Sequence, residues 1–92
     1  MWSILESDVV RKSVRKLQPE LLGKYEFWKN IVRMSGPRGL RLIKGFRDES
    51  LSGKWKGFRS SRLNKQYRVL YRVEEDEVAV YVIDVNAHDY RR

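Results

Sequence analysis

The second half of the chain has a pattern of β-branched and aromatic residues that only a few folds can accommodate. From residue 54 onward, three runs rich in β-branched and aromatic residues follow one another, at residues 55–63, 66–73 and 77–85. Turns of two or three residues separate them, at Asn64-Lys65 and at the acidic residues 74–76. Strands that are joined by such short turns pair antiparallel with their neighbours. The sequence therefore predicts a three-stranded antiparallel meander in this half of the chain.

The order of side chains within the runs indicates which faces are packed. In the second run, apolar and aromatic residues at 67, 69, 71 and 73 alternate with Arg68, Leu70 and Arg72. One face of this strand is thus predicted to be packed, while the other carries guanidinium groups. The third run is apolar on both faces, which predicts a central strand. Gly57 stands where the alternation of the first run fails, which predicts a bulge or a bend.

The first third of the chain has helical spacing instead. Residues 2–5 are predicted to form a short strand, and Ser7 caps a helix with apolar residues at 10, 14, 17 and 21. Pro19 suits the first turn of a second helix, which Gly36-Pro37 ends. The expected fold is α+β: a short N-terminal strand, a two-helix hairpin and the antiparallel three-stranded meander, with the sheet packed on two helices. Residues 1–92 are expected to form a single domain.

The charge of the chain predicts a polyanionic partner. There are 20 Lys and Arg residues against 12 Asp and Glu, a net charge of +8. Residues 50–73 contain seven basic residues and no acidic one. Nucleic acid, an anionic membrane surface and an acidic protein all fit such a charge. With no cysteine and one histidine, the sequence excludes thiol chemistry and disfavours a zinc site. Neither a signal peptide nor a membrane span is recognisable, so the protein is expected to be cytoplasmic.

The single histidine, His88, lies near the C-terminus beside Asp89, Tyr90, Arg91 and Arg92. Histidine can act as general acid or base near neutral pH. RNA carries its own nucleophile, the 2′-hydroxyl, so cleavage without a metal needs only a base, an acid and cations for the phosphate. His88 can supply proton transfer, and Arg62 and Arg68 can hold the phosphate. Stacking on a base is open to Trp55, Tyr67 or Tyr90.

Each of these residues also has a simpler interpretation. A lone histidine near a terminus is more often a surface residue than a catalyst. Arg62 and Arg68 are more often solvated charges, or partners of Asp48 or Glu49. Trp55 and Phe58 are more often part of a core. A metal-dependent nuclease would need clustered carboxylates, and the only dense cluster, residues 74–77, lies in a predicted turn.

Residues 51–63, LSGKWKGFRSSRL, followed by QYRVLY at residues 66–71, resemble the RelE/ParE superfamily of bacterial toxins. The similarity is greatest to its RelE, YoeB and YafQ mRNA-interferase branch. The Leu-x-Gly-x-Trp element, the Arg62 to Arg68 spacing, the Tyr-Arg-hydrophobic-hydrophobic-Tyr strand and the terminal His-x-Tyr match in order. The resemblance is specific from about residue 49 onward, and the layout of predicted elements extends it to the whole chain.

This resemblance implies a type II toxin that cleaves mRNA as a metal-independent, ribosome-dependent endoribonuclease, without a cofactor. The implied fold is a sheet packed on two helices, as in small microbial ribonucleases. The implied partners are a cognate antitoxin protein and mRNA in the ribosomal A site, with contacts to the ribosome and its 16S rRNA. The implied roles are phosphate stabilisation for Arg62 and Arg68, proton transfer for His88, base orientation or shared proton transfer for Tyr90, and RNA contacts for Lys54, Lys56 and Arg59. Arg91 and Arg92 are expected to contact backbone phosphates.

The sequence also departs from the family pattern. RelE itself lacks the terminal histidine, and the glutamate base of YoeB-like members has no counterpart at the ungapped position, Gly45. Glu49 falls where YafQ-like members carry an upstream histidine, so it can serve as base with His88 as acid. The ParE branch poisons DNA gyrase by binding, without nuclease chemistry. A gyrase poison and a non-catalytic RNA-binding module therefore remain alternatives, and His88 favours the nuclease.

Overall fold

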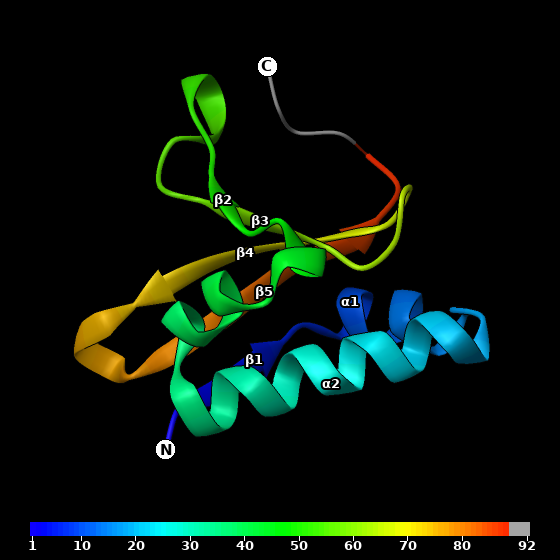
Figure 1. The fold of residues 1–92 in the computed structure, drawn as a ribbon, viewed down its shortest axis with the longest axis horizontal. Helices are drawn as coiled ribbons and strands as arrows, with labels where there is room; N and C mark the ends of the chain where they lie inside the picture. Colours follow the sequence, from blue (N-terminus) through cyan, green and yellow to red (C-terminus); the bar gives the residue numbers. More distant parts are fainter. Residues whose placement is uncertain (89–92) are drawn as a thin grey trace.

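The computed structural model describes residues 1–88 and contains two helices and five strands (Figure 1). The strands are β1 (Ser3–Glu6), β2 (Glu49–Ser50), β3 (Arg59–Arg62), β4 (Arg68–Glu74) and β5 (Ala79–Asn86). The helices are α1 (Asp8–Arg15) and α2 (Pro19–Ser35), and short 3-10 turns are η1 (Pro37–Leu42), η2 (Lys44–Phe46), η3 (Gly53–Trp55) and η4 (Glu75–Glu77). The predicted α+β class and the order of strand, two helices and strands are confirmed.

The strands form one mixed sheet in the order β1-β5-β4-β3-β2. The predicted antiparallel meander is its centre, where β3 pairs with β4 and β4 with β5. Two strands extend it: β1 runs parallel to β5 at one edge, and the two-residue β2 pairs with β3 at the other. A register shift lies between Leu70 and Tyr71. The predicted N-terminal strand is thus β1, and β2 is the strand that the sequence does not predict.

The prediction of a strand at residues 55–63 is wrong for the N-terminal half of this segment. The strand begins only at Arg59, while Gly53–Trp55 forms a 3-10 turn. Gly57 has φ +96°, a left-handed conformation that side chains rarely tolerate, and it turns the chain here. Lys54 and Lys56 therefore lie on a loop and not on a strand face. The expected bend at Gly57 is present.

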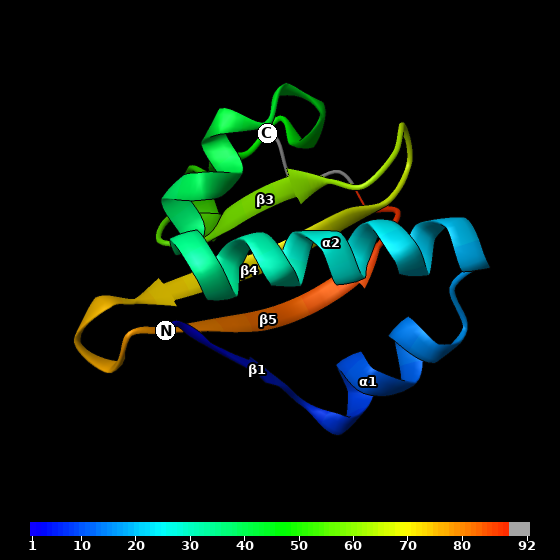
Figure 2. The same ribbon diagram turned by 60° about the horizontal axis from the view of Figure 1, so that its bottom comes forward.

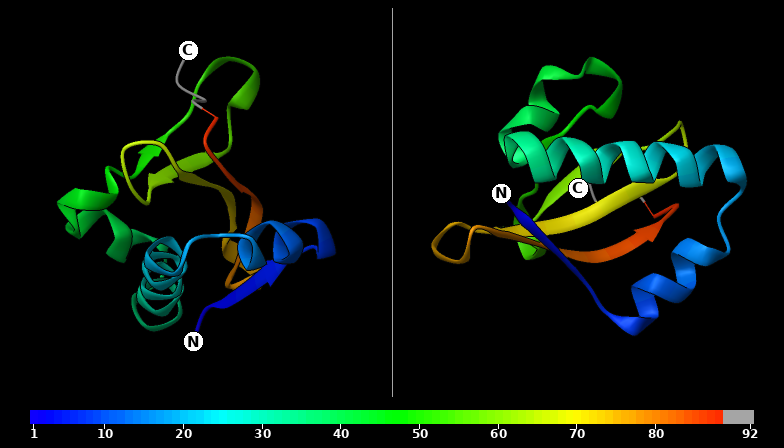
Figure 3. Two further views of the ribbon diagram at one scale, coloured as in Figure 1. Left: turned by 90° about the vertical axis from the view of Figure 1, so that its right-hand side faces the viewer. Right: turned by 90° about the horizontal axis from the view of Figure 1, so that it is seen from below.

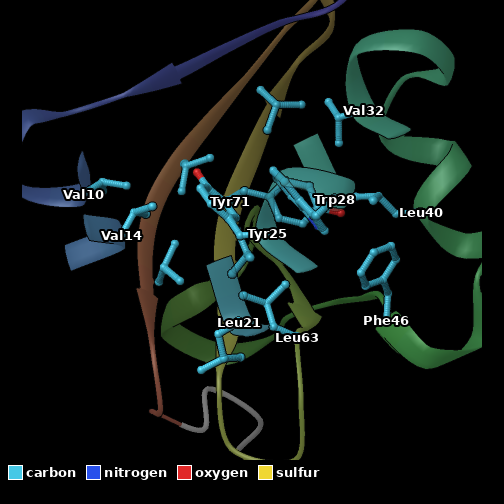
Figure 4. Packing of buried hydrophobic residues seen from close by; sticks show 14 residues of the cluster. Val10, Val14, Leu21, Tyr25, Trp28, Val32, Leu40, Phe46, Leu63 and Tyr71 are labelled. Carbon is cyan, nitrogen blue, oxygen red and sulfur yellow. The ribbon is translucent and has the colours of Figure 1, made fainter. Parts of the chain in front are cut away.

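The main core lies between the sheet and the helices (Figure 2; Figure 4). Trp28 and Tyr25 of α2 are fully buried and stack with their ring centroids 5.8 Å apart. Trp28 also meets Tyr71 of β4 edge-on at 5.3 Å. Helix α1 begins where the hydroxyl of Ser7 accepts a hydrogen bond from the Val10 backbone N–H at 3.2 Å. The apolar residues that the sequence predicts along the two helices are the ones that pack against one face of the sheet.

The two helices are steeply inclined to one another, and they leave the opposite face of the sheet open (Figure 3). Part of this open face is covered by the 51–58 loop, which connects β2 to β3. There Leu51 and Leu70 are buried and form a second small cluster, against which Trp55 and Phe58 pack. Within residues 1–88, no helix has the length and apolar character that crossing a membrane requires.

Two buried phenols make the stability of this fold sensitive to alkaline pH. Burial raises the pKa of Tyr25, and a hydrogen bond to Glu6 raises it further; burial and the charge of Asp48 likewise raise the pKa of Tyr71. A phenol in the unfolded chain ionises at about pH 10, so the stability contributed by these protonated groups is complete below that pH and lost above it. We expect the free energy of unfolding to fall by about 1.4 kcal/mol per pH unit for each tyrosine.

Urea unfolding at several pH values above about 10 measures this fall. Tyr25→Phe is expected to reduce its slope, because phenylalanine cannot ionise. An unchanged slope in that variant would contradict the assignment to Tyr25.

Candidate active site

Two arginines face each other across the centre of the open face. Arg62 of β3 and Arg68 of β4 are direct partners in the antiparallel ladder, so their side chains leave the sheet on the same side. Arg68 is only 7% exposed, and its Nη1 donates to the backbone oxygen of Gln66 at 3.0 Å. Two guanidinium groups on one face of neighbouring strands form a candidate phosphate site.

His88 lies next to this pair through β5. Asn86 is the ladder partner of Arg68, so Arg62, Arg68 and Asn86 form one row across three strands. The backbone N–H of His88 donates to Oδ1 of Asn86 at 2.9 Å, which fixes the chain just beyond β5. His88 itself is exposed. The fold thus holds the backbone of His88 beside Asn86, the ladder partner of Arg68.

A polar chain along β5 supports this placement. Asn86 donates from Nδ2 to Oδ2 of Asp84 at 2.7 Å and accepts from the His88 N–H through Oδ1. The Oδ1 of Asp84 in turn accepts from the Val85 backbone N–H at 2.8 Å. Sequence reasoning missed Asp84 and Asn86. The signal was present, because polar residues at 84, 86 and 88 alternate at the end of an otherwise apolar strand.

Glu49 lies on the same face but further across the sheet. It is the ladder partner of Ser60, which lies two residues before Arg62 on β3 and therefore shares its face. Three strand spacings, about 14 Å, separate β2 from β5. A substrate must therefore lie between Glu49 and His88 if both are to act on it.

The two lysines that are predicted to contact RNA lie on the loop between β2 and β3, which covers part of the open face. Lys54 and Lys56 are exposed on the 51–58 loop. Trp55, between them, meets Phe58 edge-on with ring centroids 5.8 Å apart. The loop thus carries two exposed cations, while its aromatic residues anchor it against Leu51 and Leu70 on the open face. The core interpretation of Trp55 and Phe58 is confirmed.

Arg59 points to the other side of the sheet. Its Nη2 and Nε donate to Oδ2 of Asp48 at 2.7 and 3.0 Å, and the Asp48 side chain is fully buried. Ser61 donates to Oδ1 of the same carboxylate at 2.6 Å, as does the hydroxyl of Tyr71. Burial by itself lowers the pKa of Arg59, but the hydrogen bonds and charge of Asp48 outweigh it, so the pKa is raised. Arg59 and Arg62 therefore occupy different faces of β3.

The remaining predicted site residues, Tyr90, Arg91 and Arg92, lie outside the described residues, as does Asp89. Among residues 1–88, no group of three or more His, Cys, Asp or Glu side chains could hold a metal ion.

The arrangement of strands, helices and open face was compared with known proteins. No protein-family model matches the sequence, and no curated protein sequence matches it. Solved structures do match over nearly the whole chain. A YoeB/ParE toxin from Agrobacterium tumefaciens is 16% identical with a TM-score of 0.76, covering 95% of this chain and 99% of that one. The chain has the RelE/ParE toxin fold.

Two further structures with this fold were determined as complexes. An archaeal RelE in a RelE–RelB complex from Pyrococcus horikoshii is 19% identical with a TM-score of 0.74, covering 94% of this chain and 93% of that one. A YoeB–YefM toxin–antitoxin complex from Staphylococcus aureus, described as heterotetrameric, gives 16% identity and a TM-score of 0.73, covering 97% and 99%. In the RelE/ParE-type fold of this chain, Arg62, Arg68 and Asn86 share one face of the sheet.

Proposed function

We propose that this protein is a type II toxin that cleaves mRNA without a metal ion. The observation that carries the proposal is the row of Arg62, Arg68 and Asn86 with His88 at its end. A guanidinium pair is suited to a phosphodiester, because each group can donate two parallel hydrogen bonds to its oxygens. The backbone N–H of His88 is bonded to Asn86 in this row, and we propose that its imidazole exchanges a proton with a group bound to that phosphate.

The proposed reaction uses the nucleophile of the RNA itself. A base takes the proton of the 2′-hydroxyl, the 2′-oxygen attacks phosphorus, and the bond from phosphorus to the 5′-oxygen breaks. An acid gives its proton to that departing oxygen, so the products are a 2′,3′-cyclic phosphate and a 5′-hydroxyl. Arg62 and Arg68 stabilise the charge that develops on the phosphoryl oxygens. His88 serves as acid or base, and Glu49 is the candidate for the complementary role.

The proposed partners follow from charge and from the fold. Lys54 and Lys56 extend the cationic face on which an RNA backbone would lie, whereas Arg59 is committed to Asp48 and is left out of the proposed site. Tyr90, Arg91 and Arg92 keep their predicted roles in base orientation and phosphate contact. Complexes such as YoeB–YefM support a cognate antitoxin as the protein partner. Action on mRNA in the ribosomal A site remains part of the proposal.

Induced expression in bacteria tests the function directly. A nuclease depletes full-length mRNA and stops translation, and the 5′ ends of the fragments carry hydroxyl groups. A gyrase poison, the second candidate because ParE-type proteins share this fold, induces a DNA-damage response while mRNA stays intact. Intact mRNA in growth-arrested cells would contradict the nuclease proposal. A binding module without catalysis would leave both mRNA and DNA intact.

Glu49→Gln tests the proposed base. Glutamine keeps the size of the side chain but cannot accept a proton from the 2′-hydroxyl. If Glu49 is the base, the cleavage rate is expected to fall by about 10²–10⁴-fold. The measurement is the rate of fragment formation by primer extension, with Ser50→Ala on the same two-residue strand as a control that should cleave normally. Full cleavage by Glu49→Gln would remove Glu49 from the mechanism and leave His88 in place.

A further inference from the structure

A hollow of about 230 Å³ lies at the end of β5, around the strand edge from the arginine row. Its lining comes from three places: Ser13, Lys16 and Leu17 at the end of α1, Tyr67 before β4, and residues 85–87. The proposed reaction uses none of these residues directly. The hollow is smaller than the pockets that hold whole drug-sized ligands, so it has room for a part of one nucleotide.

The hollow shares a wall with the proposed site. Asn86 lines it, and Asn86 is both the ladder partner of Arg68 and the acceptor for the His88 N–H. Leu17, Tyr67 and Val85 of the lining also belong to or pack against the main core, so the hollow lies on the helix-covered side of β5 and is reached from the arginine row around the end of that strand. An RNA strand that places one phosphate at Arg68 and turns around the end of β5 would bring a neighbouring nucleotide to the hollow.

The chemistry of the lining suits a nucleotide. Lys16 is exposed and can place its ammonium group on a phosphate, and Tyr67, which is half-buried against the main core, also lines the hollow. Aromatic rings of this kind stack with nucleic-acid bases whatever their sequence. The helix adds to the local field, because Arg11, Lys12 and Arg15 precede Lys16.

Lys16 has a competing structural role. It caps the C-terminus of α1, and Lys12 and Arg15 lie in the last helical turn, where cations stabilise the helix dipole. That role gives Lys12 and Lys16 similar effects on stability. Only Lys16 lines the hollow, so a difference between the two lysines in RNA binding separates the roles.

We infer that this hollow is a nucleotide subsite. It holds the nucleotide next to the cleaved phosphodiester, with Lys16 on its phosphate and Tyr67 against its base. The inference rests on the proposed ribonuclease function and gives it a second contact point on the RNA.

The test compares Lys16→Ala with Lys12→Ala in binding a short fluorescent RNA whose 2′-hydroxyls are methylated, so that it cannot be cut. Fluorescence anisotropy gives Kd at several salt concentrations. Lys16→Ala is expected to raise Kd by about five- to tenfold and to reduce the slope of log K against log salt by about 0.7, one phosphate contact to a single strand. Lys12→Ala is expected to change Kd by less than about twofold, and Lys16→Arg to restore binding.

Equal losses in Lys12→Ala and Lys16→Ala would overturn the subsite, because general charge would then explain both. A lack of measurable binding by the unaltered protein in low salt would overturn it as well. The proposed function is judged separately, by mRNA loss on expression. If mRNA is cut while the two lysine variants bind alike, the subsite fails and the ribonuclease stands.

Discussion

His88→Ala is expected to abolish growth inhibition and mRNA cleavage while the protein stays folded. General acid or base catalysis contributes about 10²–10⁴-fold to a rate, and no other histidine in the chain can replace it. The side chain is exposed, so its removal should change the free energy of unfolding by less than about 0.5 kcal/mol. The measurements are growth after induction, primer extension on a cellular mRNA, and thermal unfolding followed by circular dichroism.

Arg38→Ala supplies a control for this experiment. Arg38 is an exposed cation on η1 and lines a hollow with Glu75, which follows the end of β4 opposite to Arg68, so its loss tests for a general effect of charge. Full toxicity from His88→Ala would contradict proton transfer by His88. Toxicity lost together with thermal stability would instead show that His88 supports the fold, which would also count against the catalytic assignment.

The parts of the fold that the sequence predicts are those with local causes. The alternation through residues 66–73 defines β4, and Ser7 and Pro19 mark the helix starts because capping is local. The parallel pairing of β1 with β5 has no local signal, since it depends on where α1 and α2 return the chain. The two-residue β2 is too short for any periodicity to reveal it.

In the candidate site, too, the sequence predicts some contacts and not others. The short connection between β3 and β4 makes Arg62 and Arg68 ladder partners, which their spacing and the predicted turn anticipate. The burial of Asp48 could not be anticipated, because it lies in a long irregular connection and meets Arg59 and Tyr71 only in the tertiary fold. The sequence therefore predicts Arg59 to be one of the RNA-binding cations, whereas its ion pair with Asp48 lies on the other face.

The Asp48 carboxylate is expected to contribute more to stability than any other polar group described above. Its side chain is fully buried, and it accepts hydrogen bonds from Arg59, Ser61 and Tyr71. Asp48→Ala leaves the guanidinium of Arg59, whose side chain is 18% exposed, without its carboxylate. Breaking a buried ion pair by removing one partner costs about 3–5 kcal/mol. Urea unfolding at neutral pH measures the loss.

Asp8→Ala is the matched control, because the Asp8 carboxylate pairs with Arg11 at the surface, where an ion pair contributes about 0–1 kcal/mol. The double variant Asp48→Ala with Arg59→Ala is expected to be more stable than the sum of the single losses predicts, since no unpaired guanidinium remains. Asp48 immediately precedes Glu49 and the 51–58 loop, so its loss should also loosen that edge of the open face. A loss of unfolding free energy no larger than that of Asp8→Ala would show that water replaces the carboxylate, and that the network does not anchor β2.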